Sequence, residues 1–576
     1  MKPIKKLHSI NQIKLFFVIT LFTILAVLVM SSLCWATTYY VDATNGNDSN
    51  PGILQSAPWK TIAKVNASNF NPGDSVLFKR DEVWREQLTV PSSGSPGDPI
   101  TFGAYNSGDK PIISGANLVT GWTLESGNVW KTNATTEAHA VYFDGVRGTK
   151  KDSIGNLNQV HDWYWLHNIL YVYSASAPHT NYTSPGIEAV VRTSGIATNQ
   201  KSYITIDGLT IKQAWIWGIG DTNCNSDNWI VQNCTVQNIG PTSGEADPVG
   251  IYLGRYSDNW IIQDNTVSDT ESIKETGSSL GAAIYIGNVY EGGDKGGDDN
   301  TIRRNMLTGG STGIAIKYGG DGNLVTQNEI HAYTWSGIAS IGEDTAGNTI
   351  SYNFIHDIRG SGDSGIQVYG PDDIYGNIIE NCFNGIYINC QSSDQENNFN
   401  ACDDLKIYNN DIIDNYESIY FDNSGAPTAQ NNLVKNNITV DTGANVGKVI
   451  DFEEEDDIVG AGNVFDHNLY YDTTSITFRI QDGTGDGGGF KTFAQWQAVY
   501  SQDSNSPTPS DPLFTNPGAG DFTLQSGSPA IGKGTDVGLT TDYLGNPIKG
   551  VPDIGAYEYY KEDSNQPVPP AGFSFK

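Results

Sequence analysis

The sequence has few charged residues, and basic residues are a minority among them. Charged side chains make up 17% of the 576 residues, with 33 lysines and arginines against 65 aspartates and glutamates. Such a surface repels nucleic acid and anionic membranes. It would also repel a polyanionic glycan unless Ca²⁺ or a local basic patch intervened. We therefore expect no nucleic-acid partner.

Cysteine is also scarce, with six residues in the chain. None of them has zinc-ligand spacing with a histidine, and five remain beyond the N-terminal leader, an odd number. Cys382 falls at an inward-leaning repeat position, which indicates a buried thiol. A Cys390–Cys402 bridge closing a loop would suit an exported protein, although the sequence leaves it open. The chain also lacks a nucleotide-binding loop, a zincin helix and a serine-centred elbow.

Residues 1–36 have the pattern of a secretory signal. Four lysines precede an apolar run over 15–30, and Ala36 can sit before the cleavage site. The alternative is an uncleaved anchor, because the run is near the lower length limit for a membrane span. Cleavage leaves 29 basic and 65 acidic residues. We expect a secreted, periplasmic or cell-surface monomer with no membrane contact.

A repeat organises residues 201–482. Short runs of alternating apolar residues follow an asparagine that recurs at intervals of 23 to 40 residues, at Asn233, Asn265, Asn305, Asn328, Asn353, Asn377, Asn410, Asn437 and Asn468. Period-two strands at such intervals indicate a solenoid whose coils bury their inner faces against neighbours. Asparagine suits the tight corner because it tolerates left-handed backbone. The sequence predicts an all-β, right-handed, single-stranded parallel β-helix.

Each coil carries a second marker, such as Gly250-Ile-Tyr-Leu or Gly385-Ile-Tyr-Ile. The Ile and the residue two later should point inward, which leaves the residues between and after them outward. Aligning the coils on this Ile gives one outward column of tyrosines: Tyr252, Tyr285, Tyr387 and Tyr420. The next column contains Gly254, Gly287, Lys317, Ile341, Tyr369, Asn389, Asp422, Glu453 and Arg479.

Other segments frame the repeats. We expect an N-terminal cap and first coils over 37–114, an aromatic-rich inserted β-subdomain over 115–200, a C-terminal capping segment over 483–560 and a flexible tail over 561–576. The aromatic residues of the insertion could stack on sugar rings or pack against the coils.

Two segments carry a family resemblance. Tyr39-Tyr-Val-Asp, Pro72-Gly-Asp-Ser-Val and Lys110-Pro-Ile-Ile-Ser-Gly resemble the cap and first coils of secreted bacterial right-handed β-helix proteins, which include pectate-lyase-like polysaccharide lyases. Ser528-Pro-Ala-Ile-Gly and Asp553-Ile-Gly-Ala-Tyr-Glu resemble their C-terminal closing segment. The resemblance implies this fold, export and activity on a polysaccharide.

The leading hypothesis is a lyase that cleaves an acidic glycan by β-elimination. That reaction removes a proton α to a carboxylate, so it needs a base and a group that neutralises the carboxylate. Lys317 is the candidate base and Arg255 a candidate partner. Oxygen ligands from Asp294, Asp298 and Asp299 could hold Ca²⁺, which resembles the lysine-plus-calcium scheme of pectate-lyase-like enzymes. Tyr252, Tyr285, Tyr369, Tyr387 and Tyr420 would bind the sugar rings.

Carboxylates support the alternative of a glycoside hydrolase, which uses one acid and one base or nucleophile. The candidates on neighbouring coils are Asp422, Asp451 and Glu453, and a second loop set comprises Glu245, Asp247, Glu271 and Glu275. The acidic run over 453–457 also fits a solvated turn. His331 and His356, with Glu380 next, share a repeat position and could bind metal or form an inert ladder. An epimerase and a non-catalytic glycan-binding surface protein also remain open.

Overall fold

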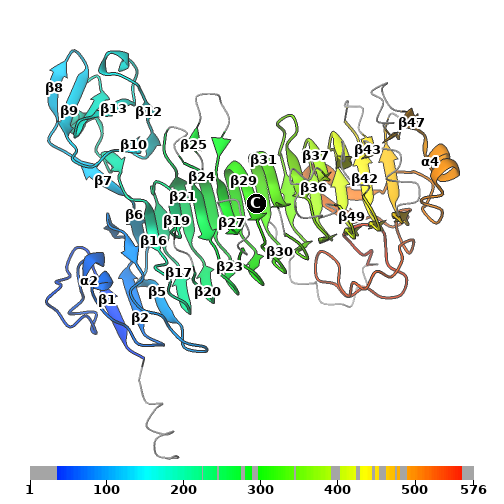
Figure 1. Ribbon diagram of the computed structural model, residues 1–576, viewed down its shortest axis with the longest axis horizontal. Coiled ribbons are helices and arrows are strands. Elements are labelled where there is room, and N and C mark those ends of the chain that lie inside the picture. The colour runs from blue at the N-terminus through cyan, green and yellow to red at the C-terminus, as the bar shows by residue number, and fades with distance from the viewer. Residues whose placement is uncertain are drawn as a thin grey trace, which may run out of the picture.

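The computed structural model describes residues 36–560 except for short segments (Figure 1). The segments outside the description are 223–224, 243–245, 271, 274–278, 288–295, 343–344, 391–401, 423–428, 444–447, 453–461, 474–475 and 481–488. The predicted signal and tail therefore lie outside the described residues, apart from Ala36. Within the described part, no helix is long and apolar enough to cross a membrane.

The chain winds into stacked coils that form an elongated rod (Figure 1), and each coil contributes up to three short strands. The first strands pair in parallel as a 13-stranded sheet made of β1 (Thr38–Val41), β2 (Ser75–Lys79), β5 (Ile100–Tyr105), β17 (Ile204–Asp207), β20 (Trp229–Gln232), β23 (Ile261–Gln263), β28 (Thr301–Arg303), β30 (Leu324–Thr326), β32 (Thr349–Ser351), β35 (Asp373–Tyr375), β38 (Lys406–Tyr408), β41 (Leu433–Lys435) and β44 (Val464–Asp466).

The second and third strands of the coils join into one 23-stranded sheet. The second strands are β3 (Val83–Trp84), β6 (Ile112–Ser114), β18 (Thr210–Lys212), β21 (Thr235–Ile239), β24 (Thr266–Thr270), β33 (Phe354–His356), β36 (Ile378–Glu380), β39 (Asp411–Ile413), β42 (Ile438–Asp441) and β45 (Leu469–Asp472). The third strands are β4 (Leu88–Thr89), β16 (Ser194–Ala197), β19 (Trp217–Ile219), β22 (Val249–Leu253), β27 (Ala282–Gly287), β34 (Ser364–Val368), β37 (Asn384–Asn389), β40 (Glu417–Asp422), β43 (Lys448–Phe452) and β46 (Phe478–Ile480). Two long strands, β29 (Met306–Lys317) and β31 (Glu329–Ile341), run through both positions. We call the outward side of the third strands the third-strand face. The predicted parallel β-helix is confirmed.

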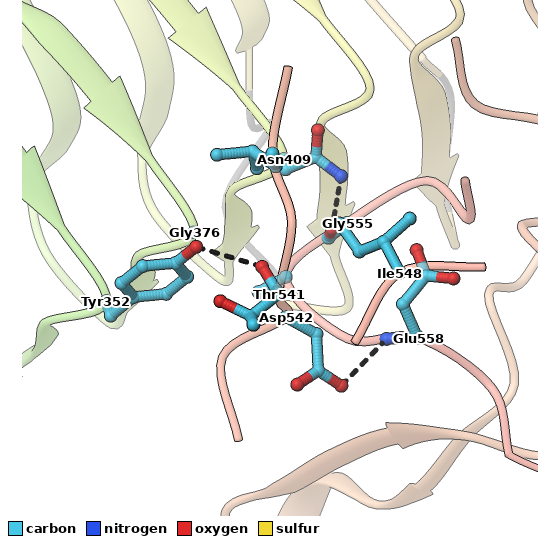
Figure 2. Close-up of a pocket in the computed structure, with 10 residues that line it drawn as sticks. Tyr352, Gly376, Asn409, Thr541, Asp542, Ile548, Gly555 and Glu558 are labelled. Carbon is cyan, nitrogen blue, oxygen red and sulfur yellow. Dashed lines mark hydrogen bonds between the residues drawn. The ribbon is translucent and has the colours of Figure 1, made fainter. Parts of the chain in front are cut away.

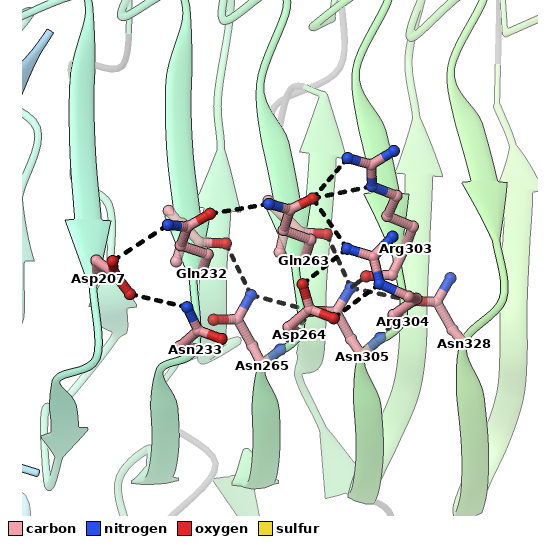
Figure 3. Close-up of polar contacts among 12 residues, drawn as sticks. Asp207, Gln232, Asn233, Gln263, Asp264, Asn265, Arg303, Arg304, Asn305 and Asn328 are labelled. Atoms are coloured by element: carbon pink, nitrogen blue, oxygen red, sulfur yellow. Dashed lines mark hydrogen bonds and ion pairs between the residues drawn. The ribbon is translucent and has the colours of Figure 1, made fainter. Parts of the chain in front are cut away.

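The corner between first and second strands is held by an asparagine ladder, part of which Figure 3 shows. Each side-chain oxygen accepts the backbone N–H of the equivalent residue one coil earlier, at 2.9–3.1 Å. All of its members are buried: Asn265, Asn305, Asn328, Asn353, Asn377, Asn410, Asn437 and Asn468. The ladder satisfies polar groups that the tight corner would otherwise leave buried without partners.

The sequence predicted left-handed backbone at the corner asparagines, but that conformation falls on the residue before each ladder member, such as Asp264, Arg304 and Tyr352. Asn233 is one of these preceding residues and is not a member of the ladder. Asn233 is exposed, and its amide donates to Asp207 Oδ1 at 2.9 Å. The ladder position belongs to Cys234, whose buried backbone N–H donates to Asn265 Oδ1. Asn233 instead takes the left-handed backbone of the corner, with φ +53°.

A second ladder lies five residues before the first and was not predicted. Its members accept backbone N–H groups from the preceding coil at 2.7–2.9 Å: Asn300, Asn323, Asn348, Asp372, Asn432 and Asn463. The sequence signal is the constant spacing, since Asn300 precedes Asn305 as Asn348 precedes Asn353. The two ladders fix both ends of the first strands in the central coils that carry them.

Stacked isoleucines fill the core behind the third strands. Register aligns Ile251, Ile284, Ile314, Ile338, Ile366, Ile386, Ile419 and Ile450, and each is at most 1% exposed. Burying each such side chain contributes roughly 1.5–3 kcal/mol. In the last coil the register pairs Ile450 with Phe478, not with Ile476. Arg479 therefore pairs with Asp451 in the tyrosine column, which corrects its predicted place in the next column after Glu453.

Residues 116–190 form two small sheets beside the first coils (Figure 1, cyan), antiparallel except where β12 pairs in parallel with β13. Their strands are β7 (Ala116–Val119), β8 (Thr123–Ser126), β9 (Val129–Asn133), β10 (Ala140–Phe143), β11 (Val146–Arg147), β12 (Thr149–Lys150), β13 (Asp162–Leu166), β14 (Ile169–Tyr173) and β15 (Ile187–Val190), with a short helix α3 (Pro178–Asn181) and a 3-10 turn η1 (Ile154–Asn156). Their shared core contains Trp163, Phe143 and Val172. The aromatic residues of this insertion thus mainly pack among themselves.

Both ends of the coil stack are covered. Helix α2 (Ile62–Asn66), capped by Thr61, lies in the N-terminal segment. At the other end β47 (Gly489–Lys491) runs antiparallel to β46, and α4 (Phe493–Tyr500) places Trp496 on Phe478 at a ring distance of 4.9 Å. Residues 513–560, the C-terminal strap, pack back onto the second strands. The strap contains β48 (Phe514–Asn516), η3 (Pro517–Ala519) and β49 (Asp521–Leu524). Elsewhere in the chain, β25 (Ser272–Ile273) and β26 (Ser279–Leu280) pair as a hairpin that projects from the coils.

The four cysteines within the described residues take the two roles considered from the sequence. Cys390 and Cys402 form a disulfide. Cys234 and Cys382 are free and buried, and burial raises the pKa of the Cys382 thiol to about 12. Neither free thiol is therefore a nucleophile at neutral pH.

Candidate functional site

Strand register builds an outward column along the third-strand face. It pairs Tyr252 with Tyr285 and, farther along, Tyr387 with Tyr420. Between these pairs the column passes through Ala315, Ala339 and Gln367. The alignment of coils on Ile therefore placed the four tyrosines correctly. Two alanines leave the middle of the column without a bulky side chain.

Aromatic rings continue along the N-terminal half of the face. The Trp217 and Tyr252 rings stack with centroids 6.0 Å apart, and Tyr285 follows at 5.8 Å. Tyr252 is only 3% exposed, whereas Tyr285 is half-buried. Burial raises the pKa of Tyr285 far above its ordinary value, and the neighbouring Tyr252, Tyr318 and Asp247 act in the same direction. Tyr285 therefore remains a protonated hydrogen-bond donor at any physiological pH.

Lys317 lies at the end of β29 beside the two alanines of the column. Its Nζ is 4.8 Å from the ring centroid of Trp335, and both side chains are half-buried. Burial lowers the pKa of Lys317, while the Asp247 carboxylate acts in the opposite direction. The Trp335 ring attracts the ammonium but cannot accept its proton. This lysine is thus closer to yielding a neutral amine than a solvated lysine is.

The C-terminal half of the face combines phenols with one carboxylate. The Tyr387 and Tyr420 rings stack at 5.3 Å, and the Tyr387 hydroxyl donates to Asp422 Oδ2. Asn389 donates to the Tyr369 hydroxyl at 3.4 Å. Burial raises the pKa of Tyr369, with further contributions from Tyr318 and Asp422. Asp422 is 8% exposed, so the phenol fixes a carboxylate that lies almost out of solvent.

Asp451 has a structural role that the sequence did not indicate. Its two oxygens accept from Arg479 Nε at 2.9 Å and from Lys448 Nζ at 3.1 Å, and Lys448 also pairs with Glu417. Burial raises the pKa of Asp451 to about 6, although both cations oppose this shift. Because both oxygens are engaged, Asp451 is a poor candidate for the acid or base of a hydrolase.

The predicted calcium ligands do not converge in the described residues. Asp298 Oδ1 accepts the backbone N–H of Asp321 at 3.1 Å, while Asp299 is exposed at a left-handed corner with φ +55°. Asp294 lies outside the described residues. Across the described residues, no group of three or more His, Cys, Asp or Glu side chains is arranged to hold a metal ion.

The remaining candidates are dispersed. Glu453, Glu245, Glu271 and Glu275 lie outside the described residues, whereas Asp247 is exposed just before β22. Arg255 lies in the turn after β22, two coils from Lys317.

The histidine pair lies on the second strands, away from this face. The His331 and His356 rings stack at 4.9 Å, and His356 contacts Asp357 at 2.9 Å and Glu329 at 3.7 Å. These carboxylates raise the pKa of His356 against the effect of burial, while burial lowers the pKa of His331. The pair therefore forms a ring ladder on the outside of the coils.

A crevice between the coil corners and the C-terminal strap is drawn in Figure 2. The Tyr352 hydroxyl donates to Thr541 O and the Asn409 amide to Gly555 O, both at 2.9 Å. Burial raises the pKa of Glu558, which also lines it, to about 7. These contacts hold the strap against the coils, so we regard the crevice as a structural junction and not as a binding site.

Known proteins support this architecture. Residues 294–532 match the family described as right handed beta helix region. The chain forms a right-handed β-helix. A solved complex of XylC with xylose shares this fold, with a TM-score of 0.59 and 15% identity over 91% of this chain and 99% of that one. Pectate lyase Pel9A aligns over 92% of this chain and 98% of its own at 13% identity, with a TM-score of 0.43.

One curated relative aligns with most of the β-helix. The lacto-N-biosidase of Bifidobacterium longum subsp. longum is 24% identical over an alignment of 617 positions, and this alignment covers 91% of the present chain. The β-helix chain spans only 36% of the length of that relative.

Trp335 is the residue of this face that sequence reasoning missed. It lies in β31 at a register irregularity opposite Gly310–Thr312. The signal was a difference of one residue, because Ile314 follows Asn305 by nine positions and Ile338 follows Asn328 by ten. An extra residue in one strand indicates a bulge, and bulges redirect side chains.

Proposed function

We propose that this protein is an exported carbohydrate-active enzyme that binds a polysaccharide along the third-strand face and cleaves it by β-elimination. The observation that carries this proposal is the half-buried Lys317 amine beside Trp335, with its pKa lowered by burial. A lysine in this setting can act as a general base near neutral pH.

The aromatic residues would hold the sugar rings on either side of this base. Half-buried Tyr285 lies toward the N-terminus and Tyr369, Tyr387 and Tyr420 lie toward the C-terminus. Ring faces stack on the apolar faces of sugars, and a phenol that stays protonated donates to their hydroxyls. Between them lies the half-buried Lys317 amine, beside which the sugar that loses its proton would be bound.

β-elimination also requires that the substrate carboxylate be neutralised. We assign this role to Arg255, with hydrogen bonds from the protonated phenols of Tyr285 and Tyr369. Among the described residues, no cluster of three or more carboxylates is arranged for calcium, and Asp298 Oδ1 accepts the backbone N–H of Asp321. No step is therefore assigned to a metal, and a calcium requirement remains a prediction that chelation tests.

A glycoside hydrolase is the second candidate, and the lacto-N-biosidase relative favours it. Asp422, oriented by the Tyr387 hydroxyl, would be one of its two carboxylates. A hydrolase creates new reducing ends without an unsaturated sugar, which separates the two candidates in one assay.

The test uses the mature protein with a panel of uronic-acid and neutral glycans, with Ca²⁺ or a chelator. Absorbance of the unsaturated uronate and new reducing ends are measured together. The proposal predicts both signals, and the loss of both in Lys317→Ala. The matched control is Lys406→Ala, which removes an exposed lysine paired with Asp373 on the first strands. Reducing ends without absorbance would establish the hydrolase, and binding without either signal would indicate a non-catalytic protein.

A further inference from the structure

The inserted subdomain leaves and rejoins the coils at one seam near the N-terminal end of the third-strand face. The backbone N–H groups of Val191 and Arg192 both donate to Gly115 O at 3.1 Å. Gly115 also approaches the next coil so closely that a Cβ would lie 2.3 Å from Gln213 O. Arg192 is thus held just before β16, four coils before Lys317, which is about 19 Å along the stack axis at the usual strand spacing. The two residues are also offset along the strands, because Arg192 precedes Ser194 whereas Lys317 lies beyond the register partner Thr312.

The Arg192 guanidinium is half-buried and bonds only neutral acceptors. Its Nη2 donates to Asn117 Oδ1 at 2.8 Å and its Nη1 to Gly115 O at 3.3 Å. Among the described residues it forms no ion pair. Burial lowers the pKa of Arg192, an effect that Glu86 partly opposes from a distance. A buried charge without a counter-ion is unfavourable, and a bound anion would relieve that cost.

Other cations at the same seam are not fully balanced either. Arg85 and Lys212 share a single carboxylate, that of Glu188, at 2.7 and 3.6 Å. Glu188 is completely buried and also accepts from the Gln213 amide at 3.0 Å. With Arg192 and Glu86 included, three cations face two carboxylates. This local positive charge occurs in a chain whose formal net charge is −32, and it would attract an anionic group that the remaining surface repels.

Aromatic residues connect this seam with the rest of the face. The backbone N–H of Trp215 donates to Arg192 O at 2.9 Å, and the Trp215 ring stacks on His139 of the insertion at 3.8 Å. Two residues later, Trp217 starts the stack that continues through Tyr252 to Tyr285. Trp217 and Tyr252 are buried, so this packed ridge of rings leads from the seam to Tyr285, the first half-buried ring of the face.

We infer that Arg192 forms an anion subsite that receives a carboxylate or sulfate group of an acidic oligosaccharide bound along the third-strand face. Two of the five guanidinium N–H donors are used internally, which leaves three for a ligand. The planar donor arrangement matches a carboxylate in particular. Arg85 and Lys212 add long-range attraction. The subsite concerns binding alone, so it does not depend on Lys317 being catalytic.

The experiment compares each acidic glycan with its neutral counterpart. Dissociation constants are measured for oligogalacturonate, oligoalginate and oligoglucuronoxylan, each with its carboxyl-reduced form, and for dextran sulfate with dextran. The protein carries Lys317→Ala in all arms so that no glycan is consumed. We expect at least one acidic member to bind more tightly than its neutral form, and Arg192→Gln to weaken that binding about tenfold without changing the neutral form, as for the loss of a charge-assisted hydrogen bond.

Arg303→Gln is the matched control, because Arg303 also bonds a neutral acceptor, Gln263 Oε1, but on the first strands. Arg192→Lys, which keeps the charge, tests folding and should restore part of the affinity. The inference is wrong if no acidic glycan is preferred, or if Arg192→Gln and Arg303→Gln have equal effects. Preference for uronates or for dextran sulfate identifies the anion. An acidic preference in a protein that cleaves nothing would support the subsite while refuting the proposed lyase.

Discussion

At the scale of single residues, the buried ladder asparagines should contribute more to stability than the exposed corner residue Asn233. Asn353 accepts the N–H of Asn328 and donates to Val325 O, all within the buried interior. Replacing it by Ala orphans both backbone groups, and each orphan costs about 1–3 kcal/mol. We expect Asn353→Ala to lower the free energy of unfolding by about 3 kcal/mol, measured by denaturant titration.

Asn233→Ala is the natural comparison, because Asn233 is exposed and outside the ladder. Ala disfavours the left-handed backbone that Asn233 adopts, at φ +53°, so this exposed substitution should still cost about 1 kcal/mol, clearly less than Asn353→Ala. Equal losses for the two variants would show that the ladder bonds contribute nothing beyond the turn itself.

The proposed base also makes a single-residue prediction. The Asp247 carboxylate raises the pKa of Lys317, against the lowering caused by burial. Since the base acts when deprotonated, Asp247→Asn should shift the rising limb of the profile of kcat/KM against pH to lower pH. The control is Asp536→Asn, which removes an equal charge from the exposed strap. A shift to higher pH, or an equal shift in the control, would contradict the assignment.

At the scale of elements, the disulfide joins the end of β37 to the return of its loop. The Cys390 N–H donates to Asp422 O and the Cys402 N–H to Tyr369 O, both at 2.7 Å. The bridge therefore fixes the strand ends that carry the phenols and carboxylate of the C-terminal half. Replacing both cysteines by Ser should lower stability by about 3 kcal/mol, the usual value for a loop of this length. Thermal melting with and without reductant checks this, because reductant should destabilise only the native protein.

The periodicity of the sequence was sufficient to predict the coils, because strand period and corner asparagines are local signals. It also placed Tyr252 beside Tyr285, since register follows from aligning the buried Ile of each coil. It failed where a coil departs from the repeat. Arg479 was misplaced because Phe478, not Ile476, fills the core position of the last coil. The Lys317–Trp335 contact could not be predicted, because it depends on how a bulged residue leans across its neighbours.

The sequence also failed to predict the ion pairs of Asp451, for a similar reason. The sequence showed an outward carboxylate but not that Lys448, three residues earlier, and Arg479, one coil later, reach its two oxygens. Contacts of this kind depend on side-chain direction between coils, which repeat spacing does not encode.

At the scale of the whole molecule, the buried carboxyl groups make the folded state more stable at acidic pH. Burial raises the pKa of Asp411 to about 8, of Asp372 to about 7 and of Glu558 to about 7. A carboxyl with a raised folded pKa gives its full stabilisation below its ordinary value near 4 and loses it as the pH rises toward the folded value. Stability should therefore fall between about pH 4 and pH 8.

Asp411→Asn tests this dependence, because Asn is neutral throughout. Asp411 Oδ1 accepts the N–H of Ala556 from the strap, a role that an amide oxygen can keep. We expect the melting temperature of the variant to change less between pH 5 and pH 8 than that of the native protein, and to be higher at pH 8. Asp536→Asn should leave the pH dependence as it is. An unchanged dependence in Asp411→Asn would refute the role of this carboxyl.

The direction of β47 has a consequence for how the molecule behaves in a concentrated solution. A stack of parallel coils is a template that could in principle extend by adding the coil of another chain, as a fibre does. Because β47 runs antiparallel along β46 and α4 covers the coil beneath, the final edge offers a reversed strand that does not continue the parallel winding. Deleting 489–500 would uncover a parallel edge at one end of the rod, and light scattering should then detect end-to-end association of two molecules. The cap formed by β47 and α4 thus limits the rod to a fixed length.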